Sequence, residues 1–218
     1  MLIYLCGKKG SGKSTCCEIL MKKGFVKTSF ARPLKECIAS LYNVDISLLD
    51  NLEFKEGKLE IPWEWNVDKF QELCKFFDIE ADYRKIPVIM DEMCGGDRFF
   101  YTPREAMQYI GTDILRAIDP EFHVNRTIPL IEDLLNQGKS VCLDDVRFFN
   151  EKSKLEGLGK IGQGQSIGIY VDRKLESKDS HSSENTLLPE HFDYVIKNDS
   201  TKEELVGKFN LLLEYIGC

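Results

Sequence analysis

The segment LIYLCGKKGSGKST, residues 2–15, decides the fold because an apolar run passes directly into a loop crowded with glycine and lysine. Glycine weakens both helices and strands, and neighbouring lysines repel one another, so neither element explains this composition. A loop whose backbone N–H groups close around a bound anion does explain it. Residues 7–14, GKKGSGKS, match the phosphate-binding pattern G-x-x-x-x-G-K-[ST] in full, between an expected strand and an expected helix.

This loop is expected to bind a nucleoside triphosphate. Its backbone N–H groups and the positive end of the following helix would face the phosphates. The Lys13 side chain would reach the β- and γ-phosphates, and the Ser14 hydroxyl would bind Mg²⁺. ATP and Mg²⁺ are therefore the expected cofactors. The loop residues expected to bind ATP are Gly7, Lys9, Gly10, Ser11, Gly12, Lys13, Ser14 and Thr15.

Strands and helices are expected to alternate along the chain, which predicts an α/β fold with a parallel sheet and helices on its faces. The expected strands are residues 2–6, 25–30, 140–146, 166–171 and 193–196. The expected helices are residues 13–23, 33–42, 103–118 with a break or bend at Gly111, 124–136 and 201–216. The last helix is expected to begin after the N-cap residues Asp199 and Ser200. Residues 44–100 form an expected insertion within a single domain, 1–218.

Length, charge and cysteine content narrow the class of protein. A chain of 218 residues can build one sizeable core, and no apolar run reaches the length of a membrane span. No N-terminal segment has the pattern of a secretory signal. The net charge of −7 argues against binding to polymeric nucleic acid. The eight cysteines include no C-x-x-C pair, which disfavours a zinc site and suits the cytoplasm.

A phosphate loop alone does not distinguish a kinase from a GTPase, a motor or a transporter ATPase, so a second group of functional residues is needed. Two acidic strand ends are available, VIMDE at 88–92 and VCLDDVR at 141–147, and the second is favoured because an arginine follows its aspartates. Arg147 would bind anionic oxygens, and Asp145 would position the acceptor or the water shell of the metal. Arg104 is the strongest further arginine. The polar stretch at about 173–188, with Arg173 and His181, has the composition of a mobile lid.

Several stretches together resemble one family. They are TPREAMQYIGTDILR (102–116), LDDVRFFNE (143–151), the D-x-H-x-x-E of Asp179, His181 and Glu184, and KNDSTKEEL (197–205). With the phosphate loop, they resemble the deoxynucleoside monophosphate kinases of large bacteriophages and viruses, in the P-loop nucleoside/nucleotide kinase superfamily. The resemblance implies a three-layer P-loop kinase fold, a viral origin and a homodimer. It implies transfer of the γ-phosphoryl group of ATP to a deoxynucleoside monophosphate, with small-molecule nucleotides as partners and neither nucleic acid nor membrane.

The resemblance also implies residue roles. Lys35 would approach the acceptor nucleotide, Arg104 with Gln108 would bind its phosphate or sugar, and Gly111 with Thr112 would lie near its base. Phe122 and His123 occupy the position from which a ring can stack on that base. Asp145 and Arg147 would hold the acceptor with Glu151 behind them, Arg173 would cover the phosphates, and Asn198 with Asp199 would surround adenine. The implied catalytic residues are Lys13, Arg104, Asp145, Arg147 and Arg173, and the implied metal-binding residues are Ser14 and Asp145.

Two other functions fit parts of the sequence. A dephospho-coenzyme A kinase on the same scaffold would use the NDS loop at 198–200 equally well. A nucleotide-dependent switch would need no acceptor, and its lid would be a switch loop. The absence of an N-K-x-D tetrapeptide from the sequence weakens a GTPase interpretation. Turnover of ATP separates these functions, because a kinase consumes ATP quickly only when its acceptor is present.

Overall fold

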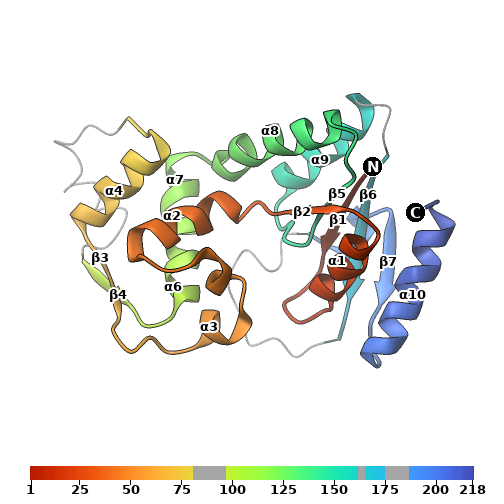
Figure 1. Ribbon diagram of the computed structural model, residues 1–218, viewed down its shortest axis with the longest axis horizontal. Helices are drawn as coiled ribbons and strands as arrows, with labels where there is room; N and C mark the ends of the chain where they lie inside the picture. Colours follow the sequence, from red (N-terminus) through yellow and green to blue (C-terminus); the bar gives the residue numbers. More distant parts are fainter. Residues whose placement is uncertain (81–96, 162–164, 175–186) are drawn as a thin grey trace. The chain divides into compact units, whose positions relative to one another are not determined.

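The computed structural model describes residues 1–80, 97–161, 165–174 and 187–218 (Figure 1). The chain divides into two compact units. The first unit combines Met1–Phe30 with Val124–Cys218, and the second unit is the continuous stretch Ala31–His123. The expected insertion, 44–100, lies wholly within the second unit, which also takes in the helices on either side of it. Each unit has a core of its own.

The first unit is built on a five-stranded sheet in the order β2-β5-β1-β6-β7, in which every pair of neighbours is parallel. Leu2 of the central strand lies between Val141 and Ser166 of its two neighbours. The strands are β1 Leu2–Cys6, β2 Val26–Thr28, β5 Val141–Leu143, β6 Ser166–Asp172 and β7 Tyr194–Lys197. All five residues of β1 are buried, as expected for a central parallel strand covered on both faces.

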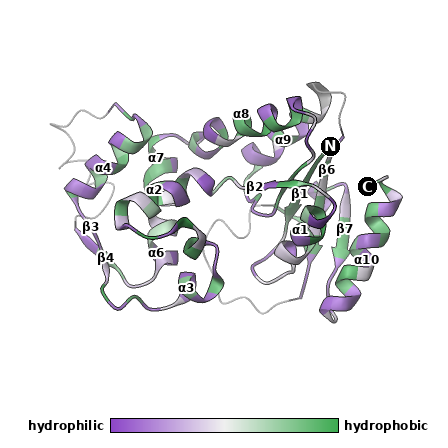
Figure 2. Ribbon diagram, viewed as in Figure 1, coloured by the Kyte–Doolittle hydropathy of each residue, from purple (hydrophilic) through white to green (hydrophobic). Residues whose placement is uncertain are grey.

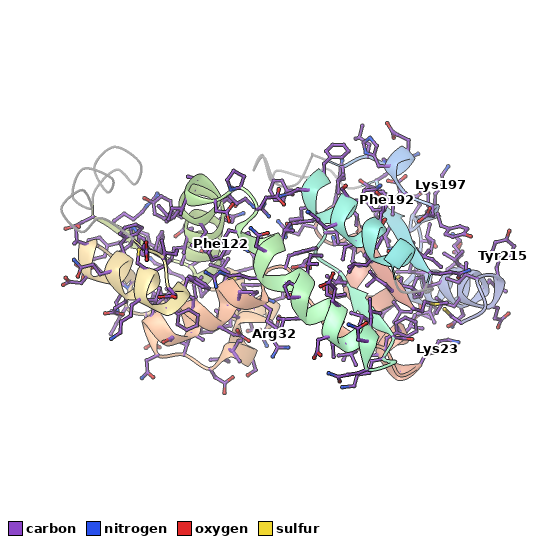
Figure 3. The ribbon with its side chains drawn as sticks, turned by 90° about the horizontal axis from the view of Figure 1, so that it is seen from above. Lys23, Arg32, Phe122, Phe192, Lys197 and Tyr215 are labelled. Atoms are coloured by element: carbon purple, nitrogen blue, oxygen red, sulfur yellow. The ribbon has the colours of Figure 1, made fainter. Side chains whose placement is uncertain are left out.

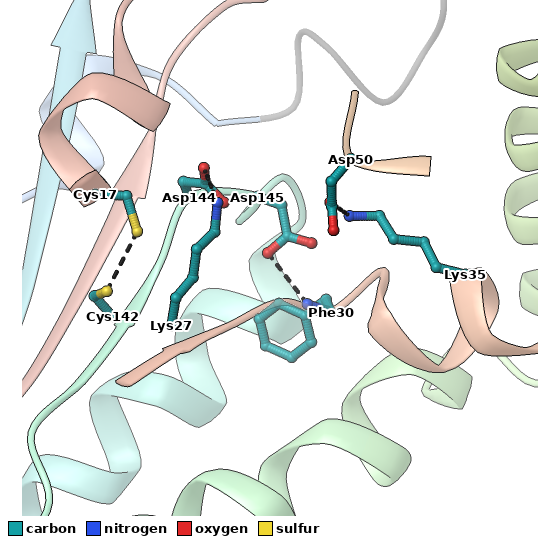
Figure 4. Close-up of polar contacts among 8 residues, drawn as sticks. All are labelled: Cys17, Lys27, Phe30, Lys35, Asp50, Cys142, Asp144 and Asp145. Atoms are coloured by element: carbon teal, nitrogen blue, oxygen red, sulfur yellow. Dashed lines mark hydrogen bonds and ion pairs between the residues drawn. The ribbon is translucent and has the colours of Figure 1, made fainter. Parts of the chain in front are cut away.

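Helices cover both faces of this sheet. Alternate residues of β1 enter different cores: Ile3 and Leu5 pack with helices α1 and α10, and Leu2 and Tyr4 pack with α8 and α9. These helices are α1 Lys13–Lys22, α8 Phe122–Asn136, α9 Phe149–Ile161 and α10 Lys202–Tyr215. On the first face, the sulfur atoms of Cys17 and Cys142 lie 3.2 Å apart (Figure 4). The predicted three-layer α/β architecture is confirmed.

The second unit is mainly helical and holds a short antiparallel ladder. Its elements are α2 Arg32–Tyr42, η1 Ile46–Leu49, α3 Leu52–Glu56, β3 Trp63–Trp65, α4 Val67–Phe77, β4 Arg98–Phe100, α6 Pro103–Gln108, the π-helix η2 Tyr109–Leu115 and α7 Arg116–Ile118. Trp63 pairs with Phe100 across the ladder. The fully buried ring of Trp65 meets Phe70 and Tyr109 edge-on, so aromatic packing fixes this core.

Several local features differ from the expectations. Strand β2 is shorter than the expected 25–30, and β5 is shorter than the expected 140–146. The expected break at Gly111 is a π-helical segment, Tyr109–Leu115. Nε2 of His123, in α8, lies 3.0 Å from the carbonyl oxygen of Gly111. The last helix begins one residue later than predicted, because the Thr201 hydroxyl caps it by accepting from the Glu204 N–H. Helix α9 was not expected at all.

Hydropathy follows this layering (Figure 2). The central strands are hydrophobic, and a helix such as α10 carries hydrophobic and hydrophilic residues on different sides, as a helix lying on a sheet does. None of the helices in the described part of the chain combines the length and the apolar composition that crossing a membrane requires.

Candidate active site

The phosphate loop joins β1 to α1 and depends on backbone conformations that favour glycine. Gly7, Gly10 and Gly12 have φ values of 140°, 75° and 106°. The Ser11 N–H donates to the carbonyl oxygen of Lys8 over 3.1 Å, which turns the loop back on itself. Gly12 is the N-cap of α1 and brings no side chain to that helix end, so the first turn of α1 faces the loop without a side-chain cap.

Lys13 lies across this loop. Its ammonium nitrogen donates to the carbonyl oxygens of Gly7, at 2.5 Å, and Lys8, at 2.8 Å. Ser14 is exposed and Thr15 is half-buried on the first turn of α1. The Lys13 ammonium is therefore held over the loop in which phosphate oxygens are expected, and its carbonyl partners can be exchanged for them.

The loop after β7 supports the phosphate loop. The side-chain amide of Asn198 donates to the carbonyl oxygen of Ser11 over 2.7 Å, and the Asn198 backbone N–H donates to Asp172 over 2.7 Å. Both Asn198 and Ser11 are buried. Within the part of the chain that the structure describes, the Ser11 hydroxyl and the Asn198 side-chain oxygen have no hydrogen-bond partner. The contact of Asn198 with adenine stays a prediction, whereas its contact with the phosphate loop is present.

We expect Asn198→Asp to weaken ATP binding, because a carboxylate oxygen cannot donate to the Ser11 carbonyl. The KM for ATP should rise about tenfold, because this is the usual effect of losing a buried hydrogen bond when one partner remains unsatisfied. Steady-state kinetics with ATP as the varied substrate measure this effect. Asn136→Asp, at the exposed end of α8, is the matched control. An unchanged KM for ATP in a folded Asn198→Asp protein would contradict a role in positioning the loop.

Two adjacent aspartates at the end of β5 point to different partners (Figure 4). Asp144 accepts from the Lys27 ammonium over 2.8 Å, and Asp145 accepts from the Phe30 backbone N–H over 3.1 Å. Burial alone would lower the pKa of Lys27, but the Asp144 carboxylate outweighs it and the pKa is raised. Because β5 lies beside β1, both carboxylates are at the carboxyl edge of the sheet, where the phosphate loop also begins. The sequence singled out Asp145 but missed the ion pair between Lys27 and Asp144.

Arg147 and Glu151 are brought together at the start of α9. The buried Glu151 carboxylate accepts from the backbone N–H groups of Arg147, over 2.8 Å, and Phe148, over 3.2 Å. Glu151 therefore shapes the turn that carries Arg147. A contact of Asp145, Arg147 or Glu151 with a nucleotide stays a prediction.

The predicted acceptor residues Lys35 and Arg104 both lie in the second unit. Lys35 pairs with Asp50 at 2.5 Å (Figure 4), and Nε of Arg104 pairs with the Glu56 carboxylate. Gln108 ends α6, and Thr112 and Gly111 lie in the π-helical segment that follows. A Cβ atom at Gly111 would meet the side chain of Leu34, so glycine allows α2 to pack closely here.

Phe122 and His123 are packed in the interior, with 4% of each residue exposed. The Phe122 ring, labelled in Figure 3, meets Phe77 edge-on with centroids 4.8 Å apart. His123 contacts the carbonyl oxygen of Gly111. Packing alone explains both side chains in this structure, and their stacking on a base stays a prediction.

The lid is only partly described. Arg173, at the end of β6, donates to the carbonyl oxygen of Gly10 over 3.2 Å, which places it at the phosphate loop. The backbone N–H of Lys174 donates to Asp199 over 3.4 Å. Residues 175–186 of the lid, including Asp179, His181 and Glu184, and the alternative acidic strand end at 88–92 lie outside the described residues.

Comparisons with known proteins identify relatives of this chain. The family described as deoxynucleotide monophosphate kinase matches residues 69–209, more than half of the chain. A protein of Acanthamoeba polyphaga mimivirus with the provisional name deoxynucleotide monophosphate kinase is 31% identical over 95% of this chain and 93% of its own. The deoxynucleotide monophosphate kinase of Enterobacteria phage T4 is 26% identical over 99% of each chain.

Solved structures give a weaker likeness. A dephospho-CoA kinase from Campylobacter jejuni matches over 99% of this chain and 96% of its own, at 16% identity and a TM-score of 0.42. The family match extends over more than half of the chain, and the match to the mimivirus relative extends over nearly all of it, the phosphate-loop unit included. By these two matches, the chain belongs to the deoxynucleotide monophosphate kinase family and is an enzyme that acts on nucleotides.

Proposed function

We propose that this enzyme transfers the γ-phosphoryl group of ATP to a deoxynucleoside monophosphate and releases ADP and the deoxynucleoside diphosphate. The observation that carries the proposal is the placement of a complete phosphate loop beside the two aspartates that end β5, on one edge of a parallel sheet. Family membership favours this acceptor over dephospho-coenzyme A, and it favours an enzyme over a switch. A homodimer and a cytoplasmic location remain predictions from the sequence.

Residues of the first unit would bind the donor. Backbone N–H groups of residues 7–14 would surround the β- and γ-phosphates, and Lys13 would exchange its loop carbonyls for phosphate oxygens. Arg173, already at the Gly10 carbonyl, would add a second positive charge. Positive groups around the phosphates stabilise the negative charge that spreads over the transferring group.

The residues present fit Mg²⁺. The Ser14 hydroxyl and the Asp145 carboxylate are hard oxygen donors, which this cation prefers. The described residues contain no group of three acidic, histidine or cysteine side chains that could hold a metal by themselves. A site that shares the ion with phosphate oxygens and water agrees with this, because Mg²⁺ keeps several of its waters in proteins. When bound, the ion neutralises part of the charge on the β- and γ-phosphates.

The acceptor needs positioning more than activation. The oxygen of a monophosphate is already anionic, so no side chain has to remove a proton from it. Lys35 would approach the acceptor, Arg104 with Gln108 would bind its phosphate or sugar, and Gly111 with Thr112 would lie near its base. Arg147 would hold the acceptor together with Asp145. Asp145 would orient the acceptor or the metal-bound waters.

We expect Asp145→Asn to lower kcat/KM for the monophosphate about thirtyfold, in the range found for loss of one charged positioning group. Asparagine keeps an oxygen for the Phe30 N–H but removes the negative charge. Steady-state kinetics with the monophosphate varied measure the effect, and Asp133→Asn, on the exposed side of α8, is the control. Unchanged kinetics would show that Asp145 has no part in the reaction.

A coupled assay of ADP release tests the function itself. ATP is supplied alone and with dAMP, dCMP, dGMP, dTMP, hydroxymethylated dCMP, the ribonucleotides or dephospho-coenzyme A. We expect very slow turnover with ATP alone and fast turnover with at least one deoxynucleoside monophosphate. Fastest turnover with dephospho-coenzyme A, or turnover that no acceptor changes, would exclude the proposed reaction.

A further inference from the structure

Three positively charged side chains of the second unit lie near one another although they come from different helices. Lys35 is on α2, Lys55 is on α3 and Arg104 is on α6. Helix α3 packs against α6, and η1, which precedes α3, packs against α2, so the fold brings Lys55 near both of the others and near Asp50 and Glu56, the carboxylates that pair with Lys35 and Arg104. The sequence had pointed to Lys35 and Arg104 separately, and Lys55 is the residue that it missed.

The cations of these two ion pairs are more buried than their carboxylates. The Lys35 side chain is 14% exposed and that of Asp50 is 66% exposed. The Arg104 side chain is 19% exposed and that of Glu56 is 35% exposed. The carboxylates therefore lie on the solvent side of the cations. An incoming anion can replace them without displacing a packed side chain, since exposed ion pairs contribute little stability.

Lys55 has an environment that opposes its positive charge. Burial, followed by the nearby charges of Lys35 and Arg104, lowers the pKa of its ammonium group. Lys55 and both carboxylates come from one short segment of the chain. Asp50 directly follows η1, and Lys55 and Glu56 are the last two residues of α3. In the described part of the chain, Lys55 forms no ion pair within 4 Å. Asp50 and Glu56 offset the burial and the two neighbouring cations only in part, so an anion bound here would favour the charged form of Lys55.

We propose that Lys55 joins Lys35 and Arg104 in a subsite for the phosphate monoester of the acceptor nucleotide, with Asp50 and Glu56 as the counter-ions that the phosphate replaces. This inference rests on the proposed function. A phosphate monoester dianion presents three acceptor oxygens, which suits three donors from three helices. The planar Arg104 side chain can bind two of the oxygens, and the two lysines supply point charges.

The first test compares Lys55→Met with Lys58→Met, a matched change at an exposed lysine three residues further on. Titration calorimetry measures binding of dAMP, dCMP, dGMP, dTMP and inorganic phosphate to the whole protein without ATP. Lys55→Met should weaken binding of the preferred monophosphate about tenfold, as expected for one charge-assisted hydrogen bond, and Lys58→Met should not. The KM for ATP should not change in either variant. Equal monophosphate affinity in the two variants would overturn the proposal.

Two further variants keep the test decisive if Lys55→Met fails to fold. Lys55→Arg retains the charge and should retain most of the affinity. Asp50→Asn removes a counter-ion from Lys35 and should strengthen monophosphate binding about twofold to threefold, in line with the modest strength of an exposed ion pair. A purely structural role for this cluster predicts the opposite result, weaker binding in Asp50→Asn, and that outcome would also overturn the subsite.

Dependence on pH provides a separate readout. The charged groups near Lys55 are Lys35 of α2, Asp50 after η1, Glu56 of α3 and Arg104 of α6. Because its pKa is lowered, Lys55 loses its proton at a lower pH than an ordinary lysine, and a phosphate binds only the protonated form well. Wild-type affinity should therefore fall as the pH rises through that lowered pKa, whereas Lys55→Arg should show a smaller fall, since arginine stays charged. Parallel pH profiles would contradict the inference.

Failure of the subsite can be distinguished from failure of the proposed function. If no deoxynucleoside monophosphate accepts a phosphoryl group in the coupled assay, the proposed function fails, and calorimetry with inorganic phosphate still reports on the three cations. If phosphoryl transfer occurs and Lys55→Met binds monophosphates as wild type does, only the subsite fails.

Discussion

Replacing Lys13 with methionine is expected to lower kcat about 10³-fold, the size of effect found when a cation at a transferring phosphoryl group is removed. Methionine has a similar length and helix propensity, so α1 should remain intact. The lost ammonium group is the one that now bridges the Gly7 and Lys8 carbonyls. In the reaction, it would offset the negative charge of the β- and γ-phosphates as the bond to the leaving group breaks.

The measurement is a single-turnover assay with saturating ATP and monophosphate, which separates the chemical step from product release. Lys22→Met, on the exposed last turn of the same helix, is the matched control and should keep full activity. Thermal unfolding of both variants establishes that they are folded. A folded Lys13→Met protein with more than about a tenth of the wild-type rate would show that this lysine does not act on the transferred group.

Replacing Gly12 with alanine is expected to lower kcat/KM for ATP by about two orders of magnitude, a loss of roughly 3 kcal/mol of transition-state stabilisation. Gly12 has a φ of 106°, which a side chain opposes. A Cβ atom there would also lie 2.5 Å from Leu205 and 2.9 Å from the Asn198 side-chain nitrogen. The substitution therefore disturbs the loop and also separates Asn198 from it.

Gly24→Ala separates these two causes. Gly24 has a similar φ of 92°, but a Cβ atom there would meet nothing within 4 Å. Both substitutions should lose about 1–2 kcal/mol of stability from backbone strain. Only Gly12→Ala should lose ATP binding, measured by titration with a fluorescent ATP analogue. Equal ATP affinity in the two variants would mean that the phosphate loop tolerates a side chain at position 12.

Local patterns made the layered fold and the phosphate loop predictable. The run LIYLC is apolar at every position because both faces of β1 are covered, and the loop motif fixes what must follow it. The order of the strands is not a local property. Strand β5, residues 141–143, lies between β1 and β2 although it is far from both in the sequence. Because of this placement, Asp144 and Asp145 reach different partners, Lys27 and the Phe30 backbone N–H.

The residues of the candidate site also fall into those that sequence patterns indicate and those that only the fold reveals. Lys13, Lys35 and Arg104 could be named from the sequence, because motif and resemblance point to them. Lys55 could not, since nothing in LEFKEG distinguishes it from a solvated lysine until the fold packs α3 against α6, and η1 against α2. The partner of Asn198 was also beyond the sequence, because Ser11 lies at the other end of the chain.

The two units differ in when all of their segments have been synthesised during translation. The second unit is one continuous stretch, Ala31–His123, so all of its core has been synthesised before the ribosome reaches β5. Strand β1, by contrast, leaves the ribosome before both of its neighbours and must wait for Val141 and Ser166 before either of its edges is paired. During translation the helical unit can therefore become structured first, while nascent β1, apolar and with open edges, needs protection from aggregation until β5 and β6 emerge.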